Sequence, residues 1–466
     1  MPGFRGRTHL YLFQAFNSLS FWIILRSPIV LLTAWLGGGS QAVGIVTSIM
    51  PFLTVMQIPS TRYIARFGYR RVMLAGWTAR TMIILGIVVL PFFKGIWPSR
   101  VLVLLLSCFI FCWSFFRGMA NAAWLPWIKA LVPEDQRGRY FAGQHRYIQL
   151  MGLLIFFLSG VILGKHPGAV HFSLIYGISF IAAMISLRFL SLVPSVRIPE
   201  RERVGSPLLS EVKNILRVSN YRRFLVYAGL WTIANGGFEA FTVLYLKRET
   251  GIPEQEILWL GAAGAAAMIF ILFFCGHFLD RWGSRPIMLL CLLGTMVYQG
   301  LWFCLTRGMF RPVFFNLVFL YFLYGIVRAT IWIANWRLTL HAVPREKTLV
   351  ALAVYTTGVG LLGGITPLVW GFLLARLPGD VISPFGWFFL TEIALNFLAF
   401  LVLRMVREES AEKTWNVALA ILLFPMRSLS ELMSFRWKNI QALKNDSPQE
   451  GSCPEEAETR AENRES

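Results

Sequence analysis

The sequence predicts an all-α membrane protein with twelve transmembrane helices in two pseudo-symmetric six-helix bundles. Its composition is the first observation: 56% of the 466 residues are hydrophobic and only 15% are charged, whereas a soluble domain carries about 25% charged residues. The apolar residues form long continuous runs, which favour helices over the short alternating strands of a membrane barrel. The third observation is that similar sequence motifs recur at equivalent positions in the two halves of the chain.

Twelve apolar segments are long enough to cross a bilayer, which takes about 20 residues of helix. The expected spans of the first half are 9–36, 41–60, 71–93, 101–131, 141–164 and 170–193. Those of the second half are 221–246, 254–279, 285–306, 312–341, 347–376 and 384–404.

The net charge of +20 reflects membrane topology rather than nucleic-acid binding. Lys and Arg gather in short clusters between the apolar segments, mostly in loops on the side of the N-terminus, and no nucleic-acid recognition motif accompanies them. Positive loops face the cytoplasm, so both termini and the 194–220 loop are predicted to be cytoplasmic.

The predicted organisation has four parts. Residues 1–193 form the first bundle, residues 194–220 a cytoplasmic linker, residues 221–406 the second bundle and residues 407–466 a cytoplasmic tail. In the linker, Ser206 and Pro207 are suited to begin an amphipathic helix. In the tail, apolar residues at helical spacing over 429–443 predict an interfacial helix, and a polar, acidic, disordered end follows.

Similar motifs recur in the two halves. GHFLDRWGSR at 276–285 follows the eighth span, and the shorter RFGYRR at 66–71 follows the second. Arg117 precedes Val132-Pro133 by the same interval at which Arg328 precedes Val343-Pro344. Such repeats are typical of many transporter folds.

With these motifs the chain resembles the major facilitator superfamily, in which a loop motif follows the second helix of each half. VPEDQRGR at 132–139 is similar to the loop after the fourth helix of many bacterial members. The resemblance implies two bundles that rock about a central cavity lined by helices 1, 4, 7 and 10, and an inner membrane location. It also implies a cytoplasmic gate motif, assigned here to Arg66, Gly68, Arg70, Arg71, Gly276, Asp280, Arg281, Gly283 and Arg285. Ala65 replaces the acidic residue of the first-half motif.

Charged residues inside the spans are candidate site residues, because such a residue costs at least about 2.5 kcal/mol at mid-membrane and persists where it faces protein or water. Arg26, Arg117, Glu239 and Arg328 lie near the middle of spans 1, 4, 7 and 10. Three arginines and one acid predict an anionic substrate, since Arg binds carboxylates and phosphates through two donors. The alternative is a structural network in which Glu239 pairs with one arginine.

Two acids are candidates for proton coupling, because Glu239 and Glu392 are the only acids deep in the predicted membrane region. Other polar and aromatic residues of spans 4, 7 and 10 are weaker candidates for contacts with substrate: Asn121, Trp124, Asn235, Trp332 and Asn335. Aromatic residues at such positions more often serve packing.

No catalytic residues, metal ligands or cofactor motifs are found, so an enzyme is not expected. The GVGLLG run at 358–363 has dinucleotide-binding spacing but lies inside span 11, without the strand that this motif requires. The predicted function is secondary active transport of a small anionic or amphipathic solute by alternating access, with protons as a candidate coupling ion. Two alternatives remain: a lipid flippase of the same fold, and a non-transporting protein serving assembly or sensing. The expected partners are a small-molecule substrate, protons and membrane lipids, with no nucleic acid.

Overall fold

In the computed structural model, the described residues are 7–196, 208–341, 348–378, 382–408, 414 and 417. The regular elements among them are helices, and the one recorded β-bridge joins Lys94 and Trp97. These helices all lie in one compact unit, Met1–Ala411. The predicted tail helix at 429–443 lies outside the described residues.

The described residues of the first half form nine α-helices and two 3-10 turns. In order they are α1 (Arg7–Leu25), α2 (Ser27–Trp35), α3 (Ser40–Phe52), η1 (Leu53–Met56), α4 (Gln57–Phe67), α5 (Tyr69–Val89), η2 (Leu90–Phe93), α6 (Ser99–Asn121), α7 (Trp124–Leu131), α8 (Glu134–Leu163) and α9 (Ala169–Ser191). The described helices of the second half are α10 (Leu208–Leu216), α11 (Ser219–Asn235), α12 (Phe238–Arg248), α13 (Glu254–Trp282), α14 (Ser284–Thr306), α15 (Phe314–His341), α16 (Thr348–Leu374) and α17 (Pro384–Arg404).

Eleven membrane spans of sufficient length and apolarity are found among the described residues. The twelfth, predicted at 221–246, is present as two shorter helices, α11 and α12, which are separated by Gly236 and Gly237. Glycine is a poor helix former, and two in succession favour this interruption. The predicted twelve-helix fold is therefore confirmed.

Three other predicted spans are interrupted where proline removes a backbone donor. The first breaks at Arg26, two residues before Pro28, and the second passes through a 3-10 turn directly after Pro51 and Phe52. The fourth breaks after Asn121, and the short helix α7 that follows contains Pro126. Each of these spans was predicted as one continuous segment, so the interruptions are a correction to the prediction.

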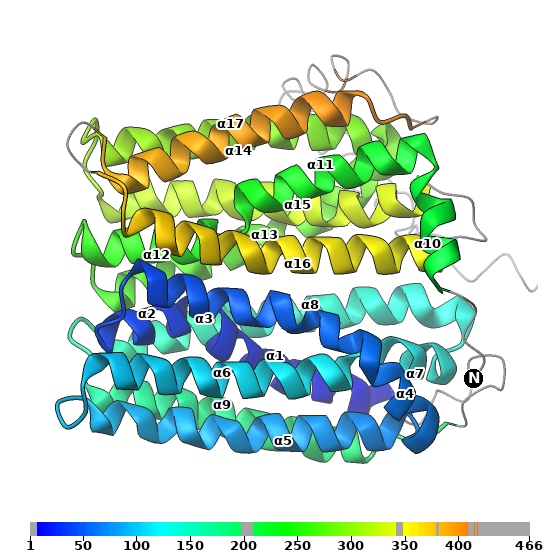
Figure 1. The fold of residues 1–466 in the computed structure, drawn as a ribbon, viewed down its shortest axis with the longest axis horizontal. Coiled ribbons are helices and arrows are strands. Elements are labelled where there is room, and N and C mark those ends of the chain that lie inside the picture. The colour runs from blue at the N-terminus through cyan, green and yellow to red at the C-terminus, as the bar shows by residue number, and fades with distance from the viewer. Residues whose placement is uncertain are drawn as a thin grey trace, which may run out of the picture. The chain divides into compact units, whose positions relative to one another are not determined.

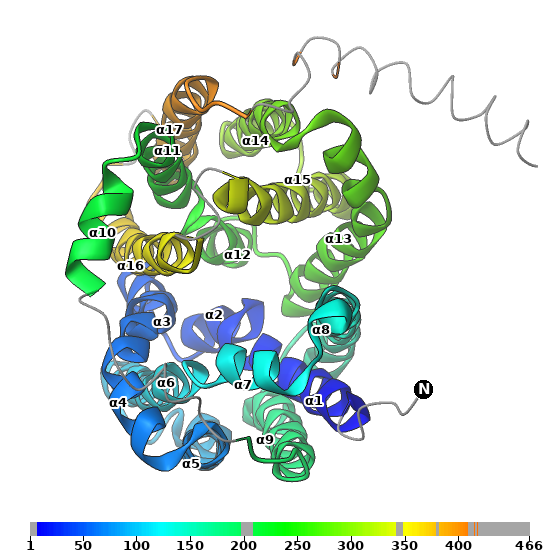
Figure 2. The same ribbon diagram turned by 90° about the vertical axis from the view of Figure 1, so that its right-hand side faces the viewer.

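The helices form two bundles, α1–α9 and α11–α17, which lie side by side, and the short helix α10 packs against α11 and α16 (Figures 1 and 2). The contacts between the bundles are made mainly by α3 with α16 and by α8 with α13, and Figure 2 shows both pairs. Glycines allow close approach at the first interface. A Cβ atom at Gly44 would lie only 2.5 Å from the carbonyl oxygen of Pro367.

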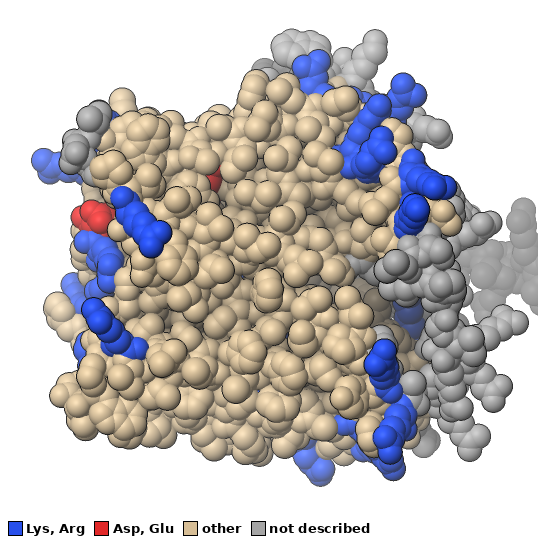
Figure 3. Space-filling view, in the orientation of Figure 1, with Lys and Arg blue, Asp and Glu red and all other residues tan. Residues whose placement is uncertain are grey.

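The surface seen in Figure 3 has a broad band almost free of charged side chains, with Lys and Arg gathered at the two ends of the helices. Large apolar side chains are exposed on the membrane-spanning helices, among them Phe273 at 72% and Phe319 at 60%. Such exposure would be costly in water but is suited to lipid. The protein is therefore an integral membrane protein.

The predicted internal repeat is visible in atomic detail. Gly68 and Gly283 occupy the same left-handed backbone region, with φ of 85° and 86°, between the second and third spans of each half. Two residues later, Arg70 donates a 2.6 Å hydrogen bond to the Ser191 carbonyl, and Arg285 donates one of 2.6 Å to the Arg404 carbonyl. Each arginine thus ties the third span of its half to the end of the sixth.

Candidate functional site

The two interrupted helices at the centre of the fold carry charged residues at their breaks. Arg26 lies between α1 and α2 in an extended conformation, with φ of −117° and ψ of −155°. Glu239 lies in the first turn of α12, just after the break at Gly236 and Gly237. Since α2 and α12 contact each other, the two breaks come together from opposite bundles.

Arg26 and Glu239 form an ion pair between the bundles. Arg26 Nη1 lies 2.5 Å from Glu239 Oε2, and the side chains are 31% and 26% exposed. The Arg26 guanidinium also lies over the Trp22 ring, 4.9 Å from its centroid. This intermediate exposure places the pair at the edge of a cavity rather than in a dry core.

A central cavity of about 220 Å³ contains this ion pair. We define it by the polar residues that line it: Arg26, Ser27, Thr47, Asn235, Glu239, Tyr324 and Arg328. The lining comes from α1, α2 and α3 of the first bundle and from α11, α12 and α15 of the second. Two arginines and one glutamate leave the lining with one excess positive charge.

Arg328 is the third charged residue of the central cavity. Its guanidinium carbon lies 5.7 Å from the Tyr324 ring centroid and 5.8 Å from that of Trp231. Within the described part of the chain, no carboxylate lies within ion-pair distance of it. The aromatic rings therefore offset only part of its charge.

A chain of hydrogen bonds connects the central cavity to Glu392 inside the second bundle. Asn235 Nδ2 donates to Asn396 Oδ1 at 3.0 Å, and Asn396 Nδ2 donates to Gln299 Oε1 at 2.9 Å. Gln299 Nε2 then donates to Glu392 Oε2 at 3.1 Å. Glu392 is fully buried, and its Oε1 atom has no hydrogen-bond partner among the described residues. Gln299 and Asn396 were not among the residues predicted from the sequence, although amides within apolar spans are a usable signal.

The remaining candidates from spans 4 and 10 do not line the central cavity. The Arg117 guanidinium lies 5.0 Å from the Phe21 ring centroid, and the Trp124 ring packs 5.1 Å from Phe13. No contact defines a role for Asn121. Trp332 stacks on His145 of the opposite bundle at 4.7 Å, and Asn335 is buried in α15. Span 4, which the resemblance implies to line the central cavity, thus contributes no residue to the lining of this cavity.

Arg80, a further arginine within a membrane span, lies in α5 and belongs to the core of the first bundle. It is 1% exposed, donates to Asn17 Oδ1, and lies between the rings of Trp77 and Trp113, 4.3 and 5.0 Å from their centroids. Ring faces and an amide oxygen surround it, so it serves the packing of that bundle.

The described arginines of the gate motif contact groups near them in the chain or within their own bundle. Arg66 and Arg281 lie over the adjacent rings of Phe67 and Trp282, and Arg71 is exposed. Glu408 accepts hydrogen bonds from the backbone N–H groups of Ser284 and Arg285, and so caps α14. Gly276 and Asp280 lie in α13, but their surroundings lie outside the described part of the structure.

Comparison with known proteins finds similarity in sequence over part of the chain and in structure over most of it. Residues 233–440 match the family model of the Major Facilitator Superfamily. No curated protein matches the chain. Several solved transporters are similar in structure. A mutant of the nucleoside transporter NupG has a TM-score of 0.68 at 12% identity, covering 86% of this chain and 100% of its own. A bacterial homologue of the iron transporter ferroportin in an inward-facing state has a TM-score of 0.63 at 16% identity, covering 87% and 99%. The inward-open xylose transporter XylE of E. coli has a TM-score of 0.64 at 14% identity, covering 89% and 99%.

Proposed function

On the premise that the chain has the fold of the major facilitator superfamily and matches its family model over residues 233–440, we propose that it is a secondary transporter of a small anionic solute. The observation that carries this proposal is the central cavity, where an ion pair from opposite bundles lies beside an arginine that has no partner acid among the described residues. Solute movement would follow from rocking of the two bundles about this cavity.

Arg328 is the proposed anchor for the solute. Its planar guanidinium can bind two oxygens of a carboxylate or phosphate at once. Glu239 already compensates Arg26, so the excess positive charge of the lining resides on Arg328. An anion bound there would neutralise the cavity and recover part of the cost of holding a charge inside the membrane.

The ion pair Arg26–Glu239 is the proposed link between solute, proton and conformation. It holds the breaks of two helices from opposite bundles together. A proton on Glu239 would remove the attraction and free Arg26 for a second contact with the anion. Glu392, connected to the cavity through Gln299, Asn396 and Asn235, is the second candidate for proton coupling.

The bundles are packed together at one end of the helices, which we call the distal end: the end that carries the α2–α3 connection, opposite the start of α1 (Figure 1). There Arg248 Nη2 donates a 2.8 Å hydrogen bond to the Gly38 carbonyl across the two bundles. Gly371 approaches so closely that a Cβ atom on it would lie 2.8 Å from the Ser40 carbonyl oxygen. Alternating access requires these contacts to break.

We also propose the membrane orientation and the division of the chain. The clusters of basic residues favour cytoplasmic termini in a bacterial inner membrane, so the distal end would face away from the cytoplasm. The division into bundles at 1–193 and 221–406, joined by a linker at 194–220 and followed by a tail at 407–466, remains part of this proposal.

The proposed function is tested by a ligand screen on the purified protein. Organic anions and matched neutral analogues are compared by thermal shift, because a ligand of the folded state raises apparent stability by mass action. We expect stabilisation by anions only, and about tenfold weaker binding in Arg328→Lys, the effect of losing about 1.4 kcal/mol. Arg376→Lys, on the exposed end of the same bundle, serves as the matched control. Equal affinity of Arg328→Lys and wild type for every anion that binds would reject the anion site.

A further inference from the structure

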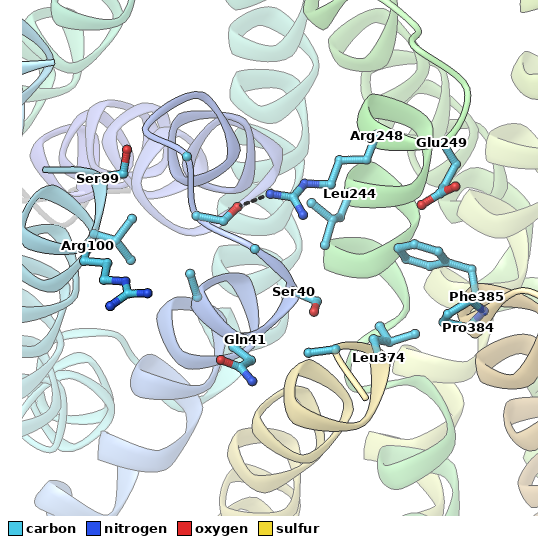
Figure 4. Close-up of a pocket in the computed structure, with 16 residues that line it drawn as sticks. Ser40, Gln41, Ser99, Arg100, Leu244, Arg248, Glu249, Leu374, Pro384 and Phe385 are labelled. Carbon is cyan, nitrogen blue, oxygen red and sulfur yellow. Dashed lines mark hydrogen bonds between the residues drawn. The ribbon is translucent and has the colours of Figure 1, made fainter. Parts of the chain in front are cut away.

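A second cavity lies at the distal end, between the two bundles and away from the ion pair. This distal pocket has a volume of about 530 Å³, within the range of about 300–1,000 Å³ that small-molecule sites occupy. The first bundle contributes Gly37–Ala42 and the start of α6, while the second contributes the ends of α12 and α16 and the start of α17 (Figure 4).

The distal pocket has an arginine on each side. Arg100 comes from α6 of the first bundle and Arg248 from α12 of the second, and Figure 4 shows Arg248 extending toward the first bundle. Arg248 gives one of its five N–H donors to the Gly38 carbonyl. Glu249 also lines the pocket, so two positive charges face one negative charge and the lining retains an excess of one positive charge.

The backbone N–H groups at two helix starts add to this positive character. Ser40 begins α3 and Ser99 begins α6, and the residues before them, Gly39 and Pro98, provide no side-chain cap. The first N–H groups of a helix have no partner inside that helix and favour a negative charge nearby. Both helix starts border the same pocket as the two arginines.

We propose that the distal pocket binds a small anion bearing a phosphate or carboxylate group, and that the bound anion joins the two bundles at this end. An anion held by Arg100 and Arg248 contacts both bundles at once, so it binds only while they are packed together here. Such a ligand stabilises the arrangement closed at the distal end and opposes its opening. This site is separate from the central cavity and does not depend on what the protein transports.

The oxyanion can come from a free solute or from the headgroup of a lipid in the adjacent leaflet. Two arms of one experiment separate these sources. The first titrates inorganic phosphate against the detergent-purified protein by thermal shift, with sodium chloride at matched ionic strength as the reference. The second compares the stability of the protein in nanodiscs of phosphatidylglycerol and of phosphatidylcholine. Both arms use the Arg328→Gln variant, so that the central cavity does not contribute.

Phosphate is expected to raise the apparent melting temperature above the chloride reference, and Arg100→Gln and Arg248→Gln are each expected to weaken its binding about tenfold. Arg376→Gln is the matched control, because Arg376 follows the pocket residue Ala375 but does not line the pocket. Arg100→Gln removes no described hydrogen bond, so a loss of binding in it is not a loss of folding. Stabilisation by phosphatidylglycerol alone, lost in both variants, would identify the headgroup as the ligand.

The bridging role has its own readout. Spin labels at His166 and Arg311, exposed positions beyond α8 and α14, report the distance between the bundles at the distal end. Phosphate is expected to shift the distribution of distances between the two labels toward shorter values. In Arg100→Gln, phosphate is expected to leave that distribution unchanged. The proposal is overturned if neither phosphate nor anionic lipid stabilises the protein. It is also overturned if adding Arg100→Gln and Arg248→Gln together leaves the stabilisation as large as in the Arg328→Gln parent.

Discussion

Replacing Glu239 by Gln removes the charge of the ion pair but keeps a similar shape and an acceptor for Arg26. A hydrogen bond to a charged group contributes about 1.5–3 kcal/mol and a neutral one about 0.5–1.5 kcal/mol. The loss is smaller here because both side chains are partly exposed, at 31% and 26%, and water screens the pair. We therefore expect the arrangement in which the bundles meet at the distal end to become about 1 kcal/mol less stable, relative to the arrangement open at that end. This change alters the ratio of molecules closed at the distal end to molecules open there about fivefold.

The population change can be measured by pulsed electron resonance with spin labels at His166 and Arg311. Glu239→Gln should raise the ratio of molecules with the longer distance to those with the shorter distance about fivefold. It should also remove the pH dependence of transport, because Gln cannot release a proton. Glu256→Gln, an acid in the first turn of α13, is the control and should behave like wild type. If Glu239→Gln shows the wild-type distance distribution at every pH, the ion pair does not couple the bundles.

The remaining predictions concern the cavity, the interface and the topology. Arg328→Lys should weaken binding of an anionic ligand in a titration with purified protein, whereas Arg117→Lys should have less than about a third of that effect, because Arg117 does not line the central cavity. Gly371→Val should abolish packing at the distal end, seen as loss of monodisperse protein or as permanent opening in the spin-label assay, because a Cβ there meets backbone at 2.8 Å. Glu392→Gln should leave the protein folded, since Gln can satisfy the Gln299 contact, and a shifted pH profile of transport would assign Glu392 to proton coupling. A Cys at Ser206 should resist an impermeant reagent added to intact cells, and labelling from outside would reject the proposed orientation.

The fold class was predictable because membrane insertion imposes a simple rule on the sequence. Each span must be long and apolar, and this requirement is met even where the helix is interrupted. The interruptions themselves were harder to predict. Pro28 and the Gly236-Gly237 pair were visible in the sequence, but tertiary contacts decide whether such residues kink a membrane helix or break it.

The candidate site was predicted only in part, because sequence shows the depth of a residue in the membrane but not the direction of its side chain. Arg26, Glu239, Asn235 and Arg328 share one cavity. Arg117 lies at a comparable depth and packs over Phe21 instead. The distal pocket was not predicted at all. Its arginines, Arg100 and Arg248, lie at helix ends, where basic residues are expected for topology alone.

We propose that the two bundles carry an anion across the membrane through the central cavity. The most direct test is counterflow, the exchange of internal for external anion in proteoliposomes, measured with the anion that gives the largest thermal shift in the screen. We predict saturable exchange that is lost in Arg328→Gln and retained in Arg100→Gln, which alters only the distal pocket. An anion that binds the purified protein yet exchanges no faster than in protein-free liposomes would contradict the claim, and would favour a non-transporting role for this fold.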